Sequence, residues 1–125
     1  MQAAGRRKGT LAVAFLALLT GYIVVNGSRA DAADPLISQG RTATASSTEN
    51  AGTPASAVVD GNNGTRWSSA FSDPQWIQID LGAAATVSRV VLNWEGAYSR
   101  AFTIQTSANG SGWSTIHTTT NGIGG

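Results

Sequence analysis

The residues whose chemistry is easiest to recognise lie in one glycine-rich turn, Asp60-Gly-Asn-Asn-Gly-Thr65. Its Asp, Asn and Thr oxygens, two or three residues apart, can fold onto one hard cation, and Ca²⁺ takes about six to eight oxygen ligands. The turn is not an EF-hand loop, since Thr65 stands where that loop needs glycine and no glutamate follows at the last position. An Asp-Gly-Asn sequence is also common in plain turns, so its spacing alone leaves both interpretations open.

Two carboxylates offer a second kind of chemistry. Glu49 and Glu95 are the only glutamates in the chain, and a carboxyl pair about 5–9 Å apart can serve as the acid and the nucleophile of a glycosidase. No nucleophile elbow accompanies them. His117, the single histidine, lies among Ser and Thr residues and is expected at the surface rather than as a catalytic base. We therefore do not expect this chain to be an enzyme.

The composition excludes several other classes of protein. The chain has 125 residues, enough for one domain. Only 12% of them are charged and the formal net charge is +1, which excludes a polybasic nucleic-acid-binding protein because counterion release needs clustered basic residues. The absence of cysteine excludes a disulfide framework, a thiolate metal site and a cysteine nucleophile.

The N-terminal segment has the pattern of a secretory signal peptide. Basic residues at 6–8 precede an uncharged apolar stretch, Leu11–Val25, and the small-x-small sequence Ala30-Asp-Ala32 follows. The alternative is a retained membrane anchor, but the stretch is shorter than the roughly 20 residues that span a bilayer. The sequence therefore predicts a signal peptide at 1–32, cleaved after its last residue, and a secreted domain at 33–125.

The predicted domain is rich in Ser, Thr and Gly, and its apolar residues alternate. Ile77, Ile79 and Leu81, for example, share one face of a strand. No segment has a sustained period of 3.6 residues, and Pro54–Val59 is at most one helical turn. Strands are expected at Thr42–Ser47, Gln75–Leu81, Val87–Trp94, Ala101–Thr106 and Trp113–Thr118, which predicts an all-β fold, an antiparallel sandwich or jelly roll.

Several linked motifs in this domain point to a family. They are Asp60-Gly-Asn-x-x-Thr-Arg-Trp-Ser68, Pro74-Gln-Trp-Ile-Gln-Ile-Asp-Leu-Gly82, Val90-Val-Leu-Asn-Trp-Glu95 and Ile104-Gln-Thr-Ser-Ala-Asn-Gly-Ser-Gly-Trp113. Their order and separation resemble the discoidin (coagulation factor V/VIII type C) domain, and within it the bacterial family 32 carbohydrate-binding modules. The resemblance implies a galactose-binding-like jelly roll of eight strands, so the last strands of the family fold are expected to be missing.

The resemblance also implies a structural calcium site in the glycine-rich turn. Asp60 would supply its carboxylate, Ala57 and Asn62 their backbone carbonyls, and Thr65 its carbonyl and hydroxyl. In the family a glutamate and a neighbouring carbonyl near the C-terminus of the domain complete the shell, and this sequence offers neither.

The implied ligand face consists of two short segments that relatives binding β-glucans or chitosan share. They correspond to Ser47-Thr-Glu49-Asn-Ala-Gly52 and Trp94-Glu95-Gly-Ala-Tyr98. Carboxylates accept hydrogen bonds from sugar hydroxyls or pair with amino groups, and an aromatic ring can lie against a pyranose. The candidate ligand residues are Glu49, Phe71, Glu95, Tyr98 and Arg100. The alternative is that these carboxylates are merely solvated, while Trp67, Trp76, Trp94 and Phe102 are expected to belong to the core or to pack on a sheet.

The resemblance therefore implies a secreted, non-catalytic carbohydrate-binding module, part of a larger glycoside hydrolase, whose partner is a β-glucan, chitosan or galactose-type glycan. The alternative from the same family is a cell-surface or phospholipid adhesion module that docks through apolar loop tips. One aromatic residue in each candidate loop and no basic rim argue against membrane docking. We expect a monomer with no nucleic-acid partner.

Overall fold

The computed structural model describes the backbone of residues 10–15, 20–27 and 36–125. Side chains are described from residue 36 onward. The elements are β1 (Thr10–Phe15), β2 (Thr20–Gly27), β3 (Thr42–Ala45), the 3₁₀ helix η1 (Ala55–Val59), β4 (Trp67–Ser68), β5 (Gln75–Asp80), β6 (Val87–Trp94), β7 (Phe102–Ser107) and β8 (Ser114–Thr119). In this part of the chain every regular element except η1 is a strand, which confirms the predicted all-β class.

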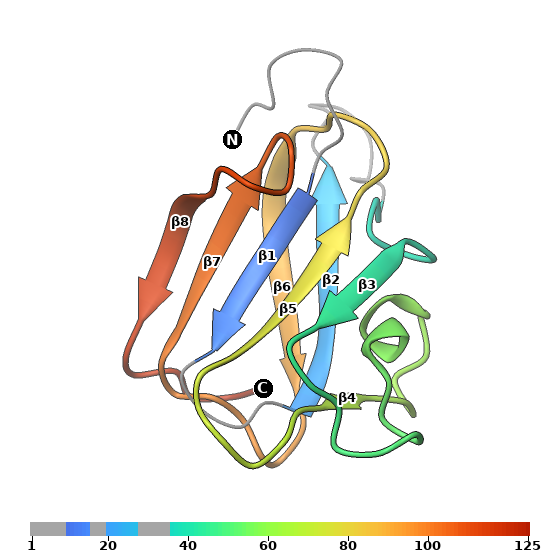
Figure 1. The fold of residues 1–125 in the computed structure, drawn as a ribbon, viewed down its shortest axis with the longest axis vertical. Helices are drawn as coiled ribbons and strands as arrows, with labels where there is room; N and C mark the ends of the chain where they lie inside the picture. The colour runs from blue at the N-terminus through green and yellow to red at the C-terminus, as the bar shows by residue number, and fades with distance from the viewer. Residues whose placement is uncertain (1–9, 16–19, 28–35) are drawn as a thin grey trace.

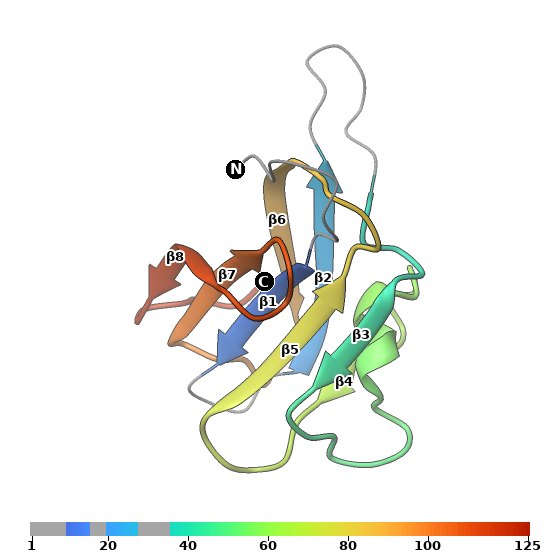
Figure 2. The ribbon, with the colours of Figure 1, turned by 45° about the horizontal axis from the view of Figure 1, so that its top comes forward.

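The strands form two antiparallel sheets. The five-stranded sheet has the order β3-β5-β1-β7-β8, and the three-stranded sheet has the order β4-β2-β6. Figure 1 shows β2 and β6 behind the five-stranded sheet, and the tilted view of Figure 2 shows the two layers crossing at an angle. The predicted antiparallel sandwich is therefore confirmed.

The core lies between the sheets and follows the alternation read from the sequence. Ile77 and Ile79 are fully buried and Leu81 is 5% exposed, as predicted for one face of β5. Trp76 lies on the opposite face, as the alternation predicts, and is 42% exposed, so of its two predicted places it has the one on the face of a sheet and not the one in the core. The buried apolar cluster contains Val58, Val59, Trp67, Ile77, Ile79, Leu81, Val87, Phe102 and Ile104, with Trp94 packed against it.

The helical turn expected near Pro54 is present as η1. The N–H of Ala57 donates to the carbonyl of Pro54 over 3.1 Å, and the carbonyl of Val59 accepts the N–H of Gly40 over 2.7 Å. Ala57 to Val59 are buried, so η1 covers one side of the core and holds the chain that enters the glycine-rich turn.

Two strands lie in the segment that the sequence assigns to a signal peptide. β1 pairs with β5 and with β7, and β2 pairs with β4 and with β6. The basic residues at 6–8 and the predicted cleavage site at 30–32 lie outside the described residues. Within the described ranges, no helix is both long and apolar enough to span a bilayer.

Candidate functional site

The loops that carry the predicted ligand residues meet at one end of the sandwich. Residues 46–53 follow β3, residues 69–74 join β4 to β5, and residues 95–101 join β6 to β7. All three loops lie at the lower end of the molecule in Figure 1, and we call them together the loop end. The predicted ligand residues all lie there: Glu49, Phe71, Glu95, Tyr98 and Arg100.

A buried glutamine connects two of these loops. Gln75 is 5% exposed, and its Oε1 accepts hydrogen bonds from the hydroxyls of Ser46 and Ser47, each over 2.6 Å. Its Nε2 donates to the carbonyl of Ser72 over 2.8 Å. Because a buried amide that makes all these bonds is costly to displace, Gln75 fixes residues 46–47 against residue 72.

Glu49 is exposed on the loop that this network holds. Its backbone N–H donates to the carbonyl of Ser68 in β4 over 2.7 Å. Close by, the indole of Trp67 donates to the carbonyl of Ser47 over 2.9 Å. Trp67 is fully buried, so of its two predicted places it has the one in the core, and its indole bond holds the loop against the core.

Phe71 is the most exposed aromatic side chain of the loop end, at 76%. Its loop is fixed at both sides, because the N–H of Ala70 donates to the hydroxyl of Ser47 over 2.9 Å and Ser72 binds Gln75. A ring held in solvent on a fixed loop can lie against the apolar face of a sugar with little loss of conformational entropy.

Tyr98 is less accessible than expected, since it is only partly exposed. Its ring centroid lies 6.4 Å from that of Trp94, and Trp94 in turn lies 5.5 Å from Phe102. A Cβ on Gly124 would be 2.8 Å from Cε1 of Tyr98. The C-terminal segment therefore packs against part of the Tyr98 ring. Next to it, the carbonyl of Arg100 accepts the N–H of Gly122 over 2.8 Å.

A pocket of about 210 Å³, which we call the polar pocket because most of the side chains that line it are polar, lies between the predicted calcium turn and the predicted ligand face. Asn63, Gly64, Thr65 and Arg66 line one side of it, and Asn93, Trp94 and Glu95 line the other. Arg66 and Asn93 are not among the ligand residues predicted from the sequence. The sequence indicated them only in part, because Asn93 lies on the polar face of a predicted strand and Arg66 lies within the Asp60–Ser68 motif.

The glycine-rich turn brings together three of the four predicted calcium ligands. The Thr65 hydroxyl lies 2.5 Å from Oδ2 of Asp60 and 2.9 Å from the carbonyl of Asn62. The N–H of Asn62 donates to Oδ1 of Asp60 over 2.8 Å, and Gly61 has a φ of +74°, which glycine adopts without strain. Ala57, the fourth, is buried in η1.

The chemistry of this turn fits a hard cation. The Thr65 hydroxyl donates to a carboxylate oxygen of Asp60 and to the carbonyl of Asn62, so three oxygen atoms lie close together, and oxygen ligands are what Ca²⁺ requires. One carboxylate is few for such a site, and the described residues contain no group of three or more His, Cys, Asp or Glu side chains placed to bind a metal. Water would have to supply part of the coordination shell.

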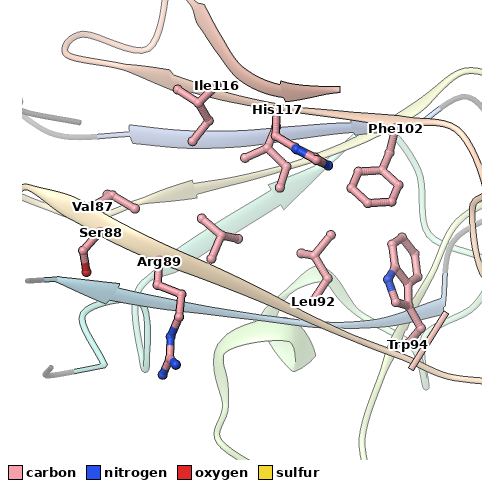
Figure 3. A pocket seen from close by; sticks show the side chains of 10 residues that line it. Val87, Ser88, Arg89, Leu92, Trp94, Phe102, Ile116 and His117 are labelled. Atoms are coloured by element: carbon pink, nitrogen blue, oxygen red, sulfur yellow. The ribbon is translucent and has the colours of Figure 1, made fainter. Parts of the chain in front are cut away.

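A second pocket, of about 410 Å³, opens between β6 and the β7–β8 hairpin. Figure 3 shows Ile116 and His117 on one side of it and Leu92 and Trp94 on the other. His117 is exposed, as predicted, and its ring lies 5.9 Å from Phe102. None of the predicted ligand or calcium residues lines this pocket, and Trp94 is the residue that it shares with the polar pocket.

Comparison with known proteins identifies the family of this sandwich. The family model of the F5/8 type C domain matches residues 42–125. A "Polysaccharide lyase 8 family protein HylA" of Enterococcus faecalis (strain ATCC 700802 / V583) is 37% identical over 68 residues, which cover 54% of this chain and 5% of that protein. The chain thus spans only a small part of that relative, and no solved structure matches. Because the family model covers most of the sandwich, this chain belongs to the F5/8 type C, or discoidin, family.

Proposed function

We propose that this chain is a non-catalytic carbohydrate-binding module that holds a polysaccharide at the loop end. The observation that carries the proposal is that exposed Glu49, Phe71 and Glu95 come from three loops at the same end of an F5/8 type C sandwich. The HylA relative is a polysaccharide lyase family protein by name, which supports a polysaccharide as the class of ligand.

The loop end offers the two kinds of contact that sugars need. Phe71 supplies an exposed aromatic face, and the carboxylates of Glu49 and Glu95 supply acceptors for hydroxyl groups or for the amino groups of chitosan. Arg66 and Asn93 add donors in the polar pocket next to Glu95. A β-glucan, chitosan or a galactose-type glycan would each satisfy this set.

A binding role accounts for these residues better than a catalytic one. Glu49 and Glu95 lie on loops attached to β4 and β6, the two outer strands of the three-stranded sheet. With adjacent strands about 4.8 Å apart, the backbones of β4 and β6 are separated by roughly 10 Å, and the Glu49 loop is bound alongside the outer strand β4, so it lies further from Glu95 than β4 does. The module would concentrate an attached enzyme on its polysaccharide, and in such a parent protein the catalytic groups would come from another domain.

Affinity electrophoresis tests the proposal. The intact chain is run through native gels that contain laminarin, chitosan or a galactan, and its mobility is compared with that in a gel without polysaccharide. We expect retardation in at least one of these gels. Unchanged mobility in all three would contradict the proposal, and hydrolysis of any of the polysaccharides would contradict the non-catalytic part of it.

Glu95→Gln and Asp80→Asn form a matched pair for this gel. Each variant removes one negative charge and keeps the shape of the side chain, so both change the mobility without polysaccharide by the same amount. Asp80 ends β5 at the side away from the loop end, where its Oδ1 accepts the N–H of Gly82 over 2.8 Å, and an amide oxygen preserves that bond. We expect the polysaccharide to retain Glu95→Gln roughly tenfold more weakly than the wild type. We expect it to retain Asp80→Asn as strongly as the wild type.

Calcium is proposed as a structural ion of the glycine-rich turn. Asp60, the carbonyl of Asn62 and both oxygens of Thr65 would hold it, with the carbonyl of Ala57 completing the protein ligands. The convergence of oxygen atoms on the Thr65 hydroxyl supports this role. Bound calcium would stiffen the turn that lines the polar pocket beside Glu95.

Export is proposed from the N-terminal pattern alone, namely a basic start, an apolar stretch and an Ala-x-Ala sequence. N-terminal sequencing of the protein recovered from culture medium tests it. A chain found only inside the cells would contradict export. A start at Ala33 would establish cleavage after Ala32.

A further inference from the structure

Two aromatic side chains are exposed among the described residues, and only one of them belongs to the loop end. Phe71 is 76% exposed and Trp76 is 42% exposed. Phe71 lies in the loop between β4 and β5, whereas Trp76 is the second residue of β5 itself. Binding at the loop end accounts for Phe71 and leaves the exposed indole of Trp76 without a role.

Trp76 lies on the outer face of the five-stranded sheet. Its neighbours in β5, Gln75 and Ile77, are buried, so the alternation of the strand turns the indole away from the core. In Figure 1 this outer face is toward the viewer, in front of β2 and β6. β3 and β5 are paired side by side there, and both strands lie within the residues that the family model matches.

The side chains beside Trp76 on this face are small or polar. The N–H of Ser46 donates to the carbonyl of Trp76, and the N–H of Trp76 donates to Oγ of Ser46, each over 2.9 Å. Thr44 is paired with Gln78, two residues further along each strand. We call Thr44, Ser46, Trp76 and Gln78 the β3–β5 face. Because serine and threonine are short, the indole is left uncovered on the side of β3.

The β3–β5 face has the two kinds of group that sugars bind. The bonds to Ser46 fix the backbone of Trp76, and an indole has only two side-chain torsions, so a ligand that covers the ring costs little conformational entropy. The ring offers a flat apolar surface to a pyranose. The Gln78 amide and the Thr44 hydroxyl each donate and accept hydrogen bonds. None of the four side chains is charged, which suits a neutral polysaccharide.

The β3–β5 face is continuous with the loop end. β3 leads into residues 46–53 and β5 begins directly after residues 69–74, so both strands reach the lower end of the molecule in Figure 1. Gln75 ties them together, because it binds the hydroxyl of Ser46 and the carbonyl of Ser72. The Cα atoms of Phe71 and Trp76 are at most about 18 Å apart along the chain. A polymer of sugars can therefore contact both rings.

We infer that the β3–β5 face is a second binding surface, and that its ligand is an internal stretch of a neutral polysaccharide that runs from Phe71 over the indole of Trp76. The Phe71 end of this path rests on the proposed function, whereas the Trp76 end rests on the exposure and the alternation of β5. The ligand class follows from the uncharged face: a β-glucan or a galactan, contacted along its length, rather than chitosan.

Oxidation of indoles by N-bromosuccinimide, mapped by mass spectrometry on the intact wild-type chain, tests the inference without a substitution. The ligand is laminarin, or the galactan where only that one retards the chain. We expect a saturating concentration to slow the oxidation of Trp76 several-fold. Trp113, partly exposed in the loop between β7 and β8, is the internal reference and should react at the same rate throughout. An unchanged rate at Trp76 in a chain that the polysaccharide retards would overturn the inference and leave the proposed function standing.

Trp76→Ala and Trp76→Phe extend the test to the affinity gels. Neither substitution changes the charge, so the mobility without polysaccharide remains that of the wild type, and urea denaturation checks that both variants fold. We expect Trp76→Ala to be retained about fivefold more weakly than the wild type. Trp76→Phe keeps an aromatic ring and should be retained nearly as strongly as the wild type.

The outcomes of these gels distinguish the inference from the proposed function. Equal retention of Trp76→Ala and the wild type, or retention of the wild type by chitosan alone, would overturn the inference only. Weaker retention of Trp76→Ala together with full retention of Phe71→Ala and Glu95→Gln would contradict binding at the loop end and leave the β3–β5 face as the site. A wild type that no polysaccharide retains would contradict both.

Discussion

The backbone N–H of Glu49 donates to the carbonyl of Ser68 over 2.7 Å. This bond ties the first loop of the loop end to β4, a strand of only two residues. β4 pairs with β2, β2 pairs with β6, and Glu95 directly follows the last residue of β6. The three-stranded sheet thus positions this loop together with Gln75 and Trp67, and the geometry of the candidate site depends on how well that sheet is held.

Ser68 itself leads to a prediction about stability. Its side chain is fully buried. Among the described side chains, its Oγ is the one buried nitrogen or oxygen atom that has no hydrogen-bond partner. An unpaired buried hydroxyl costs about 1–3 kcal/mol. Ser68→Ala should therefore raise the free energy of unfolding by about 1 kcal/mol, measured by urea denaturation.

Ser99→Ala is the matched control for that prediction. Ser99 is equally buried, but its Oγ donates to the carbonyl of Ala101 over 2.7 Å. Its removal leaves that carbonyl without the bond and should lower the free energy of unfolding by about 1 kcal/mol. Equal effects of the two substitutions would contradict this interpretation.

Gly124 should control how the C-terminal segment covers Tyr98. Its φ is +75°, and a Cβ would be 2.8 Å from the Tyr98 ring, so Gly124→Ala combines backbone strain with a clash. We expect the segment to detach, which frees the Trp94 N–H that donates to the Gly125 carbonyl over 2.9 Å. Hydrogen exchange of Trp94 should accelerate. Gly96→Ala, where a Cβ meets nothing within 4 Å, should leave it unchanged.

Calcium should stabilise the folded chain through the glycine-rich turn. Excess Ca²⁺ should raise the melting temperature relative to EDTA, because an ion at about 100 times its Kd adds about 2.7 kcal/mol when it binds only the native state. Asp60→Asn keeps an oxygen for the Asn62 N–H but removes the charge, and should abolish the shift. Asp73→Asn, an exposed loop carboxylate, should retain it. A shift that survives Asp60→Asn places calcium elsewhere.

Phe71 should be the main aromatic contact of the polysaccharide. Phe71→Ala should weaken binding about tenfold, which corresponds to about 1.4 kcal/mol, with little change in stability because the ring is 76% exposed. Phe71→Tyr should bind like the wild type, since it keeps the ring. Isothermal titration with an oligosaccharide measures both variants. Wild-type affinity in Phe71→Ala would remove this residue from the site.

The sequence predicted the fold where side chains alternate clearly. Ile77, Ile79 and Leu81 are buried as expected, and β6 has the predicted bounds. For Trp76 the sequence left the core and the face of a sheet open, and the residue lies on the outer face of β5, as its position in the alternation indicated. β4 was not predicted, because a strand of two residues is too short to show an alternating pattern of apolar and polar side chains.

The candidate site was only partly accessible from the sequence, for a physical reason. The motifs identified Glu49 and Glu95, but the pocket that joins Glu95 to Arg66 and Asn93 depends on segments that meet across the three-stranded sheet. The strand at the centre of that sheet is β2, whose apolar run is equally typical of a signal peptide. Local pattern cannot decide between the two, because pairing partners far along the chain determine the outcome.

Backbone NMR of the intact chain, titrated with an oligosaccharide of the glycan that retards it, tests the central claim most directly. The amide signals of residues 46–53, 69–74 and 95–101 should shift together and saturate at one Kd, while those of β8 should remain unchanged. Shifts confined to the apolar pocket around Ile116 and His117, or no saturable shifts at the loop end, would contradict the claim that this end binds the sugar.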